Sequence, residues 1–127
     1  RMLFEAVRVG DEKVVAELLV RAEGAGCDLS AIVEPGGQNL LMVAARHGHV
    51  SLLKPLVEEG LDIDAVNEAG KTALHIAAWK GRREVVSCLL DMGASAFIPD
   101  SSRRTALMMA AIRGDAAMAR MLLEHIE

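Results

Sequence analysis

The stretch TALHIAAWKGRREVVSCLL, residues 72–90, decides the fold because the chain repeats it. An earlier copy, NLLMVAARHGHVSLLKPLV, covers residues 39–57, and a later copy, TALMMAAIRGDAAMARMLL, covers residues 105–123. One leucine and one glycine recur every 33 residues in these copies, at Leu41, Leu74, Leu107, Gly48, Gly81 and Gly114. A fixed period of this length is typical of repeat proteins, in which each unit must stack on its neighbours to bury its apolar faces.

Each copy predicts two short helices and a loop. Thr72 can cap the first helix with its hydroxyl, and Leu74 and Ala77 lie on an apolar stripe at helical spacing. Gly81 can end that helix in the left-handed conformation. A second apolar stripe follows and stops at Gly93, after which the chain returns in an extended loop to the next threonine.

A weaker copy, LFEAVRVGDEKVVAELL, opens the chain at residues 3–19. Gly10 and Gly48 are 38 residues apart, so five extra residues lie between the first two copies. Most of them precede Gly26, which predicts a longer second helix or a longer loop after it. We therefore expect one domain over residues 1–127 with four units, at residues 1–35, 36–68, 69–101 and 102–127.

The composition fits an aliphatic globular domain. Hydrophobic residues make up 52% of the chain and charged residues 25%, which argues against disorder, while aromatic residues make up only 2%. No apolar run approaches the roughly 20 residues of a membrane span, so no membrane insertion is expected. Cys27 and Cys88 show no metal or redox spacing, and their pattern favours reduced thiols in an intracellular protein, cytoplasmic or nuclear.

These motifs resemble the ankyrin-repeat family, whose 33-residue unit carries a T-P-L-H-x-A-A stretch, a G-H between helices and a G-A-D-V-N loop. TALHIAA at residues 72–78, GHVSLL at 48–53 and GLDIDA at 60–65 match these elements, and the resemblance covers essentially the whole chain. The resemblance implies an all-α solenoid of stacked helix-turn-helix units with hairpin loops that project from one side. It also implies that His75 has a structural role and hydrogen-bonds to backbone.

Several residues depart from the family pattern. Met42 and Met108 replace the structural histidine, which predicts apolar packing in place of a hydrogen bond. Arg103 stands where the preceding loop has Gly70. A positive φ would be costly for arginine, so we expect that turn to take another form. Pro55 lies inside a predicted helix and should kink it.

The last copy should present an apolar end. A terminal unit of a solenoid needs a polar outer face. Four methionines lie instead where that face is expected, at Met108, Met109, Met118 and Met121. This pattern favours a fragment of a longer chain or a further contact at that end.

Catalytic and metal-binding interpretations find little support in the sequence. No glycine-rich loop stands between a strand and a helix to hold phosphates. His47 and His49 form an H-x-H pair, but no further ligands at zinc spacing accompany them. Asp62 and Asp64 belong to the loop motif, with no cleft to hold a substrate. We therefore expect no enzymatic activity and no cofactor.

Binding through a surface is the remaining function. In the ankyrin-repeat family, ligands contact the loop tips and the exposed residues late in each first helix, which line a concave face. In this chain that register selects Arg8, Arg46, His47, Lys71, Trp79, Lys80, Arg104, Ile112 and Arg113, together with Val9, Gln38, Glu68, Ser101, Ser102 and Arg103. Seven of the 14 basic residues fall in this set but only one of the 18 acidic ones, although the net charge is −4. The set therefore predicts a basic recognition surface with the only tryptophan near its middle.

Two functions follow from this surface and from the apolar end. The first is a non-enzymatic adaptor or scaffold whose basic concave face holds a segment of another protein, acidic or phosphorylated. The alternative is a regulatory segment of a larger polypeptide, which docks in cis or self-associates weakly through its uncapped C-terminal end. Nucleic acid is not an expected partner, because the net charge is negative and only one tryptophan could stack on bases.

Overall fold

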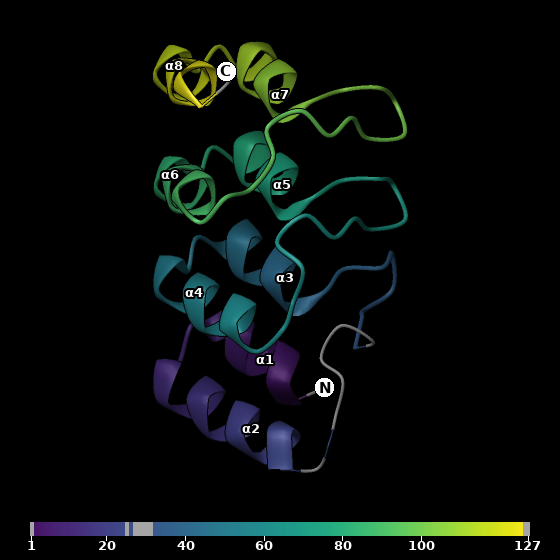
Figure 1. The fold of residues 1–127 in the computed structure, drawn as a ribbon, viewed down its shortest axis with the longest axis vertical. Coiled ribbons are helices and arrows are strands. Elements are labelled where there is room, and N and C mark those ends of the chain that lie inside the picture. Colours follow the sequence, from purple (N-terminus) through teal and green to yellow (C-terminus); the bar gives the residue numbers. More distant parts are fainter. Residues whose placement is uncertain (1, 25, 27–31, 126–127) are drawn as a thin grey trace.

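The computed structural model describes residues 2–24, 26 and 32–125 and is all-helical over them. Four antiparallel helix pairs stack along the long axis of the molecule (Figure 1). The inner helices are α1 (Met2–Val9), α3 (Leu40–His47), α5 (Ala73–Lys80) and α7 (Ala106–Arg113). The outer helices are α2 (Glu12–Gly24), α4 (Val50–Glu58), α6 (Arg83–Asp91) and α8 (Ala116–Glu124). The solenoid predicted from the repeat is thereby confirmed.

The ends of the inner helices follow the residues that the sequence provides. Asn39, Thr72 and Thr105 cap α3, α5 and α7, and each side chain accepts a hydrogen bond from the backbone N–H of the third helical residue. Each of these helices then ends at a glycine with φ between 73° and 77°, at Gly48, Gly81 and Gly114. This left-handed conformation lets the chain reverse into the outer helix within two residues.

A continuous aliphatic core joins the four pairs. Leu41 and Leu74 are each 1% exposed, because α3 packs between α1 and α5, and α5 packs between α3 and α7. The paired alanines of α3 and α5 are fully buried and leave room for neighbouring inner helices to approach. Leu107 is only partly buried, since α5 is the one inner helix that packs against α7 among the described residues.

The insertion in the first unit lengthens its outer helix. α2 has 13 residues, whereas α4, α6 and α8 have nine each. This confirms the first of the two locations that the sequence allowed. Pro55 lies inside α4, which continues through it to Glu58.

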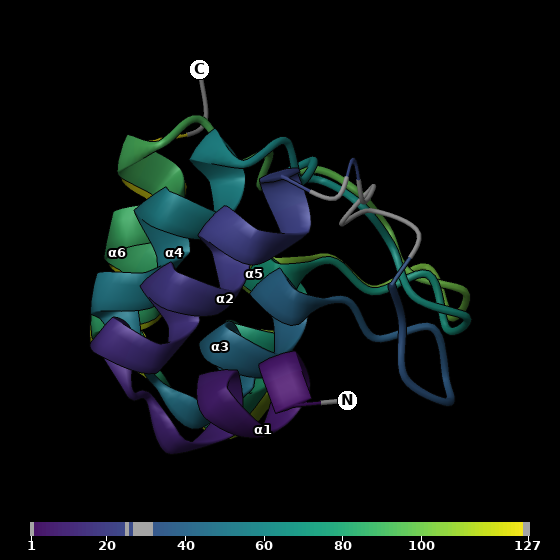
Figure 2. The ribbon, with the colours of Figure 1, turned by 90° about the horizontal axis from the view of Figure 1, so that it is seen from below.

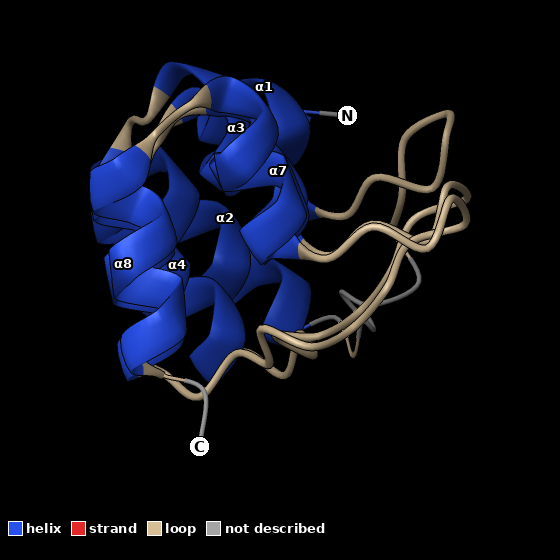
Figure 3. Cartoon of the chain, turned by 90° about the horizontal axis from the view of Figure 1, so that it is seen from above, coloured by secondary structure: helices blue, strands red, loops and turns tan. Residues whose placement is uncertain are grey.

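Long hairpin loops leave one side of the stack, and the short turns between paired helices lie on the opposite side (Figures 2 and 3). The prediction for the last loop was wrong, because Arg103 has φ 65° and takes the left-handed position that Gly70 takes with φ 76°. The same turn forms in both loops, and Gly70 N donates to Asn67 O as Arg103 N donates to Asp100 O. The hydrogen bonds to Asp100 described below hold the arginine in this strained conformation.

The apolar end was only partly predicted. Met108 is 48% exposed, and Met121 is partly buried. The prediction was wrong for Met109 and Met118, whose side chains point into the core and are at most 1% exposed. The helical period explains the difference, because adjacent residues face directions about 100° apart and only one side of α7 faces away from the stack.

Candidate functional site

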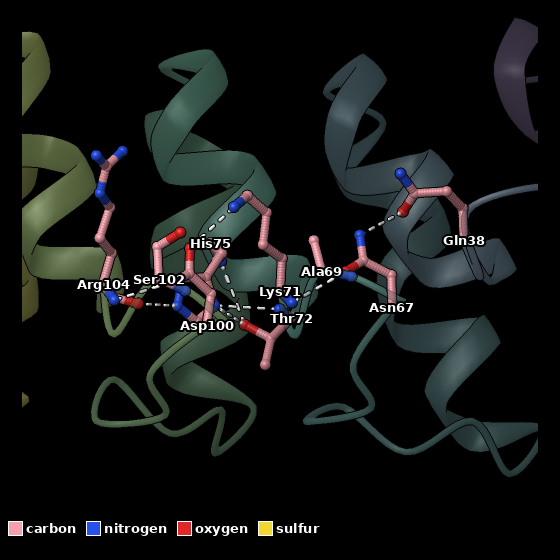
Figure 4. Close-up of polar contacts among 9 residues, drawn as sticks. All are labelled: Gln38, Asn67, Ala69, Lys71, Thr72, His75, Asp100, Ser102 and Arg104. Carbon is pink, nitrogen blue, oxygen red and sulfur yellow. Dashed lines mark hydrogen bonds and ion pairs between the residues drawn. The ribbon is translucent and has the colours of Figure 1, made fainter.

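A network of hydrogen bonds and ion pairs holds the hairpin loops together (Figure 4). The Asn67 side-chain oxygen accepts from the backbone N–H groups of Ala69 and Lys71, at 2.9 and 3.0 Å. In the next loop, one carboxylate oxygen of Asp100 accepts from the N–H groups of Ser102 and Arg104, at 2.8 and 2.9 Å. Successive loop tips also hydrogen-bond to each other, with Glu68 N donating to Gly36 O and Ser101 N donating to Ala69 O, each at 2.9 Å.

Asp100 holds a charged partner as well. Its second carboxylate oxygen accepts from Lys71 Nζ at 2.8 Å, and the carboxylate is fully buried. Burial alone would raise the pKa of Asp100, but the hydrogen bonds from Lys71, Arg104 and Ser102 lower it to about 2. Lys71 is therefore part of the loop structure, and a ligand could reach its ammonium group only in competition with Asp100.

The exposed side chains predicted for binding occupy the ends of the inner helices. Arg46, His47, Trp79, Lys80 and Ile112 are all exposed there, with Trp79 at 44% and Ile112 at 56%. We use the term concave face for the surface that these exposed side chains form. Trp79 and Ile112 occupy equivalent positions, two residues before Gly81 and Gly114, on the packed helices α5 and α7.

A hollow of about 270 Å³ brings four of the predicted residues together at the N-terminal part of this face. Arg8, Arg46 and His47 line it, with Gln38 and Glu34 from the preceding loop. Burial lowers the pKa of His47, and the nearby His49, Arg46, Arg8 and Arg82 lower it further. Because the lowered pKa favours a neutral His47 and Glu34 pairs with Arg8, Arg46 is the cationic side chain of this hollow that a carboxylate or phosphate could contact most directly.

Other predicted residues already have partners within the protein. Arg8 forms ion pairs with Glu34 and with Glu5. Arg113 Nη1 donates to Trp79 O at 2.9 Å, so its guanidinium lies over the turn that ends α5. The backbone of Arg104 makes two hydrogen bonds in the network that holds the loops together. Its side chain is exposed and takes part in no ion pair among the described residues.

The fold and the repeat signature are matched by two family models. A model described as "Ankyrin repeats (3 copies)" matches residues 3–100, and a model described as "Ankyrin repeat" matches residues 102–126. The chain belongs to the ankyrin-repeat family. Ankyrin repeats are protein–protein interaction modules, so the class of function expected from the sequence is confirmed at this level. No curated protein matches this ankyrin-repeat chain.

Sequence reasoning missed a second group of basic residues, Arg82 and Arg83. Together with Arg113 they line a hollow of about 430 Å³ at the turn between α5 and α6. We call this the turn hollow. The signal was present in the sequence, because Arg82 and Arg83 directly follow Gly81 and the 33-residue register places Arg113 in the neighbouring turn.

In the part of the chain that the structure describes, neither a metal-binding cluster nor a membrane-spanning helix is found. No group of three or more His, Cys, Asp or Glu side chains is placed there to hold a metal ion. His47 and His49 stack with ring centroids 6.2 Å apart, and His49 Nε2 makes a hydrogen bond with Arg8 O. No helix in this part is long and apolar enough to cross a membrane. Cys88 has a free thiol, and Cys27 lies outside the described residues.

Proposed function

We propose that this ankyrin-repeat chain is an adaptor whose concave face binds an acidic or phosphorylated segment of another protein. The observation that carries the proposal is the exposed indole of Trp79, with basic residues at equivalent or adjacent positions of α3 and α5. Interfaces concentrate their binding energy in tryptophan and arginine side chains near the centre. In this proposal the chain works inside the cell, catalyses no reaction, needs no cofactor and binds protein rather than nucleic acid.

The internal ion pairs decide which basic residues contribute most. Arg8 and Lys71 have carboxylate partners, so a ligand gains less from them. Arg46, Lys80 and Arg104 form no ion pair among the described residues, and all three are exposed. Their charges are therefore available to attract an acidic segment and to raise its association rate.

The apolar part of the surface provides specificity. Trp79 and Ile112 lie on neighbouring helices at equivalent positions, so a ligand residue between them would bury apolar surface on both sides. Burial of apolar area contributes about 25 cal/mol per Å² to a complex before the entropic cost of association is subtracted. We therefore expect the bound segment to combine acidic residues with at least one large apolar residue.

The experiment starts from a displayed library of acidic and phosphorylated peptides. The indole of Trp79 is the only one in the chain, so its fluorescence reports on binding directly. We expect selected peptides to change this fluorescence with a salt-sensitive Kd. Trp79→Ala should weaken capture by about 2 kcal/mol or more if the indole is a hot spot.

A charge-reversal variant on the concave face is compared with a control variant whose charge is reversed on an outer helix. Arg46→Glu with Lys80→Glu should abolish capture, whereas Arg120→Glu on the outer helix α8 should leave it unchanged. Circular dichroism should show the same helical content in all variants. Binding that survives the double variant would contradict the proposal and point to another face.

A second candidate function rests on the exposed apolar side of the last helix pair. Met108 on α7 and Leu123 on α8 are 48% and 55% exposed, and Ala111 between them in sequence is exposed as well. This surface favours docking of the chain as a regulatory segment in cis or weak self-association. Sedimentation velocity over a wide concentration range tests the second form, because a monomer at every concentration contradicts it.

A further inference from the structure

Three arginines line the turn hollow, and two of them, Arg82 and Arg83, have no part in the surface predicted from the sequence. Arg82 and Arg83 begin the outer helix of the third unit, and Arg113 reaches it from the inner helix of the fourth. Residues of the α5–α6 turn line the hollow, and the short turns between paired helices lie on the side of the stack opposite the hairpin loops (Figure 3). Three arginines from two units therefore converge on one open space of about 430 Å³.

Two of these arginines are held in place by backbone carbonyls. Arg82 Nε donates to Arg46 O at 3.0 Å, and Arg113 Nη1 donates to Trp79 O at 2.9 Å. Each accepting carbonyl belongs to the last turn of an inner helix, where carbonyls lack helical partners. Each guanidinium uses one N–H in this way and keeps others for a ligand. The two groups are therefore oriented before any ligand arrives.

The carboxylates near the hollow leave a net positive charge. Asp115 accepts from Arg83 through both oxygens and also caps α8, so it neutralises that arginine. Glu84 is exposed at the start of α6 and lines the same hollow. Neither Arg82 nor Arg113 has a carboxylate partner among the described residues. An anion would therefore meet two guanidinium groups whose charges are not yet paired.

Backbone donors of α6 add to these charges. Arg82 is the N-cap of this nine-residue helix, and its side chain makes no capping hydrogen bond. The N–H groups of Glu84 and Val85 have no acceptor among the described residues, and both residues line the hollow. At α8 the corresponding position is different, because Asp115 accepts from Met118 N. The donors at the start of α6 are thus available to an external acceptor.

We propose that the turn hollow binds a phosphate group through Arg82, Arg113 and the first free amides of α6. Guanidinium forks match the oxygen spacing of phosphate and form strong charge-assisted hydrogen bonds with it. The side chains of this site, Arg82 and Arg113, differ from the Trp79, Arg46 and Lys80 side chains proposed to bind the acidic segment. The phosphate belongs either to a small molecule or to a phosphorylated side chain of a partner.

The equivalent turns do not carry this group of residues. At the α3–α4 turn, His49 and Val50 replace Arg82 and Arg83, and Lys80 stands where Arg113 stands in the next unit. His49 makes its hydrogen bond with Arg8 O, so the structural contact is kept without a guanidinium. The arginines of the turn hollow are therefore not required by the repeat itself, which supports a role in binding.

The test is an NMR titration of the intact chain with inorganic phosphate, compared with sodium chloride at matched ionic strength. We expect saturable shifts of the Glu84 and Val85 amide signals with phosphate and none with chloride. Arg82→Gln and Arg113→Gln should each weaken phosphate binding by about tenfold, the effect of losing one charged hydrogen bond. Arg120→Gln on α8 removes an exposed guanidinium that does not line the turn hollow and should change nothing.

Two comparisons complete the test. A phosphoserine peptide that binds about tenfold more tightly than free phosphate, with the same amide shifts, would assign the phosphate to a partner protein. Equal affinities would assign it to a small molecule. If a glutamine variant loses its helical circular dichroism, Arg82→Lys replaces it and should weaken binding because lysine lacks the guanidinium fork. Non-saturating shifts in the parent chain, or unchanged binding in folded variants, would overturn the proposal.

Discussion

His75 joins the third unit to the loop of the fourth, because its Nε2 donates to the backbone oxygen of Arg104 at 2.8 Å. The other ring nitrogen, Nδ1, accepts from Thr72 N at 3.1 Å, and this contact fixes the neutral tautomer with its proton on Nε2. Thr72 Oγ1 accepts in turn from His75 N, which completes a capping box at the start of α5. One imidazole thus stabilises a helix start and the adjacent loop together.

Removal of this imidazole should destabilise the fold. His75→Ala leaves the Thr72 N–H and the Arg104 carbonyl without a partner, and the expected loss is about 1–3 kcal/mol. The free energy of unfolding in urea measures it. His47→Ala is the matched control, because His47 is exposed and its change should stay within about 0.5 kcal/mol. Equal losses in the two variants would contradict the role assigned to His75.

The same histidine should make stability depend on pH. Burial lowers the pKa of His75 below its ordinary value of 6.5, so the folded chain binds a proton less readily than the unfolded chain. Stability should therefore be complete above pH 6.5 and fall as the pH drops below it. Urea unfolding at several pH values checks the slope, which should become shallower in His75→Ala. A stability that rises as the pH falls through this window would reject the neutral tautomer.

Asp100 occupies the position in its loop that Asn67 occupies in the preceding loop. Asp100→Asn should keep the turn, since Asn67 makes the same two backbone hydrogen bonds, and should lose only the ion pair with Lys71. Asp100→Ala removes all of these contacts and should cost about 1.5–3 kcal/mol. Because the folded pKa of Asp100 is about 2, the parent chain should lose stability as the pH falls from about 4 toward 2. Thermal unfolding of the three chains across this range measures both effects, and an asparagine variant as unstable as the alanine variant would contradict them.

The left-handed Arg103 predicts a stabilising substitution. A non-glycine residue at this φ of 65° loses about 1 kcal/mol of folding stability, and glycine avoids this loss. Glycine also increases the entropy of the unfolded chain, so Arg103→Gly should change stability by between zero and about +1 kcal/mol. Arg104→Gly, beside it at an ordinary φ, should instead destabilise. A clear loss of stability in Arg103→Gly would mean that the arginine side chain makes a contribution larger than the strain.

The fold could be predicted from the sequence because its determinants are local. The cap residues, the terminal glycines and the Leu74 stripe each act within one or two turns of helix and recur at a fixed period. Arg103 was predicted wrongly for the opposite reason. Its own preference opposes a positive φ, and hydrogen bonds that converge on Asp100 outweigh it.

The candidate surface was harder to predict, because side-chain partners come from neighbouring units. Trp79 and Arg46 are exposed at the helix ends that the repeat register indicated, and their role in binding stays a prediction. The register could not show that Lys71 pairs with Asp100 or that Arg113 turns onto the Trp79 carbonyl. Such contacts depend on the direction of each side chain across the interface between units, which spacing alone does not determine.

The last prediction compares equivalent leucines in a middle unit and in the terminal unit. Leu74 is 1% exposed between two neighbours, so Leu74→Ala should cost about 2–5 kcal/mol. Leu107 is only partly buried, so Leu107→Ala should cost clearly less. Urea unfolding with helical circular dichroism measures both losses. Nearest-neighbour coupling stabilises such arrays, so amide hydrogen exchange should also be faster in residues 105–125 than in residues 72–91 of the parent chain. Equal losses at the two leucines, or uniform exchange across both units in a monomeric chain, would show that another contact covers the end of the stack.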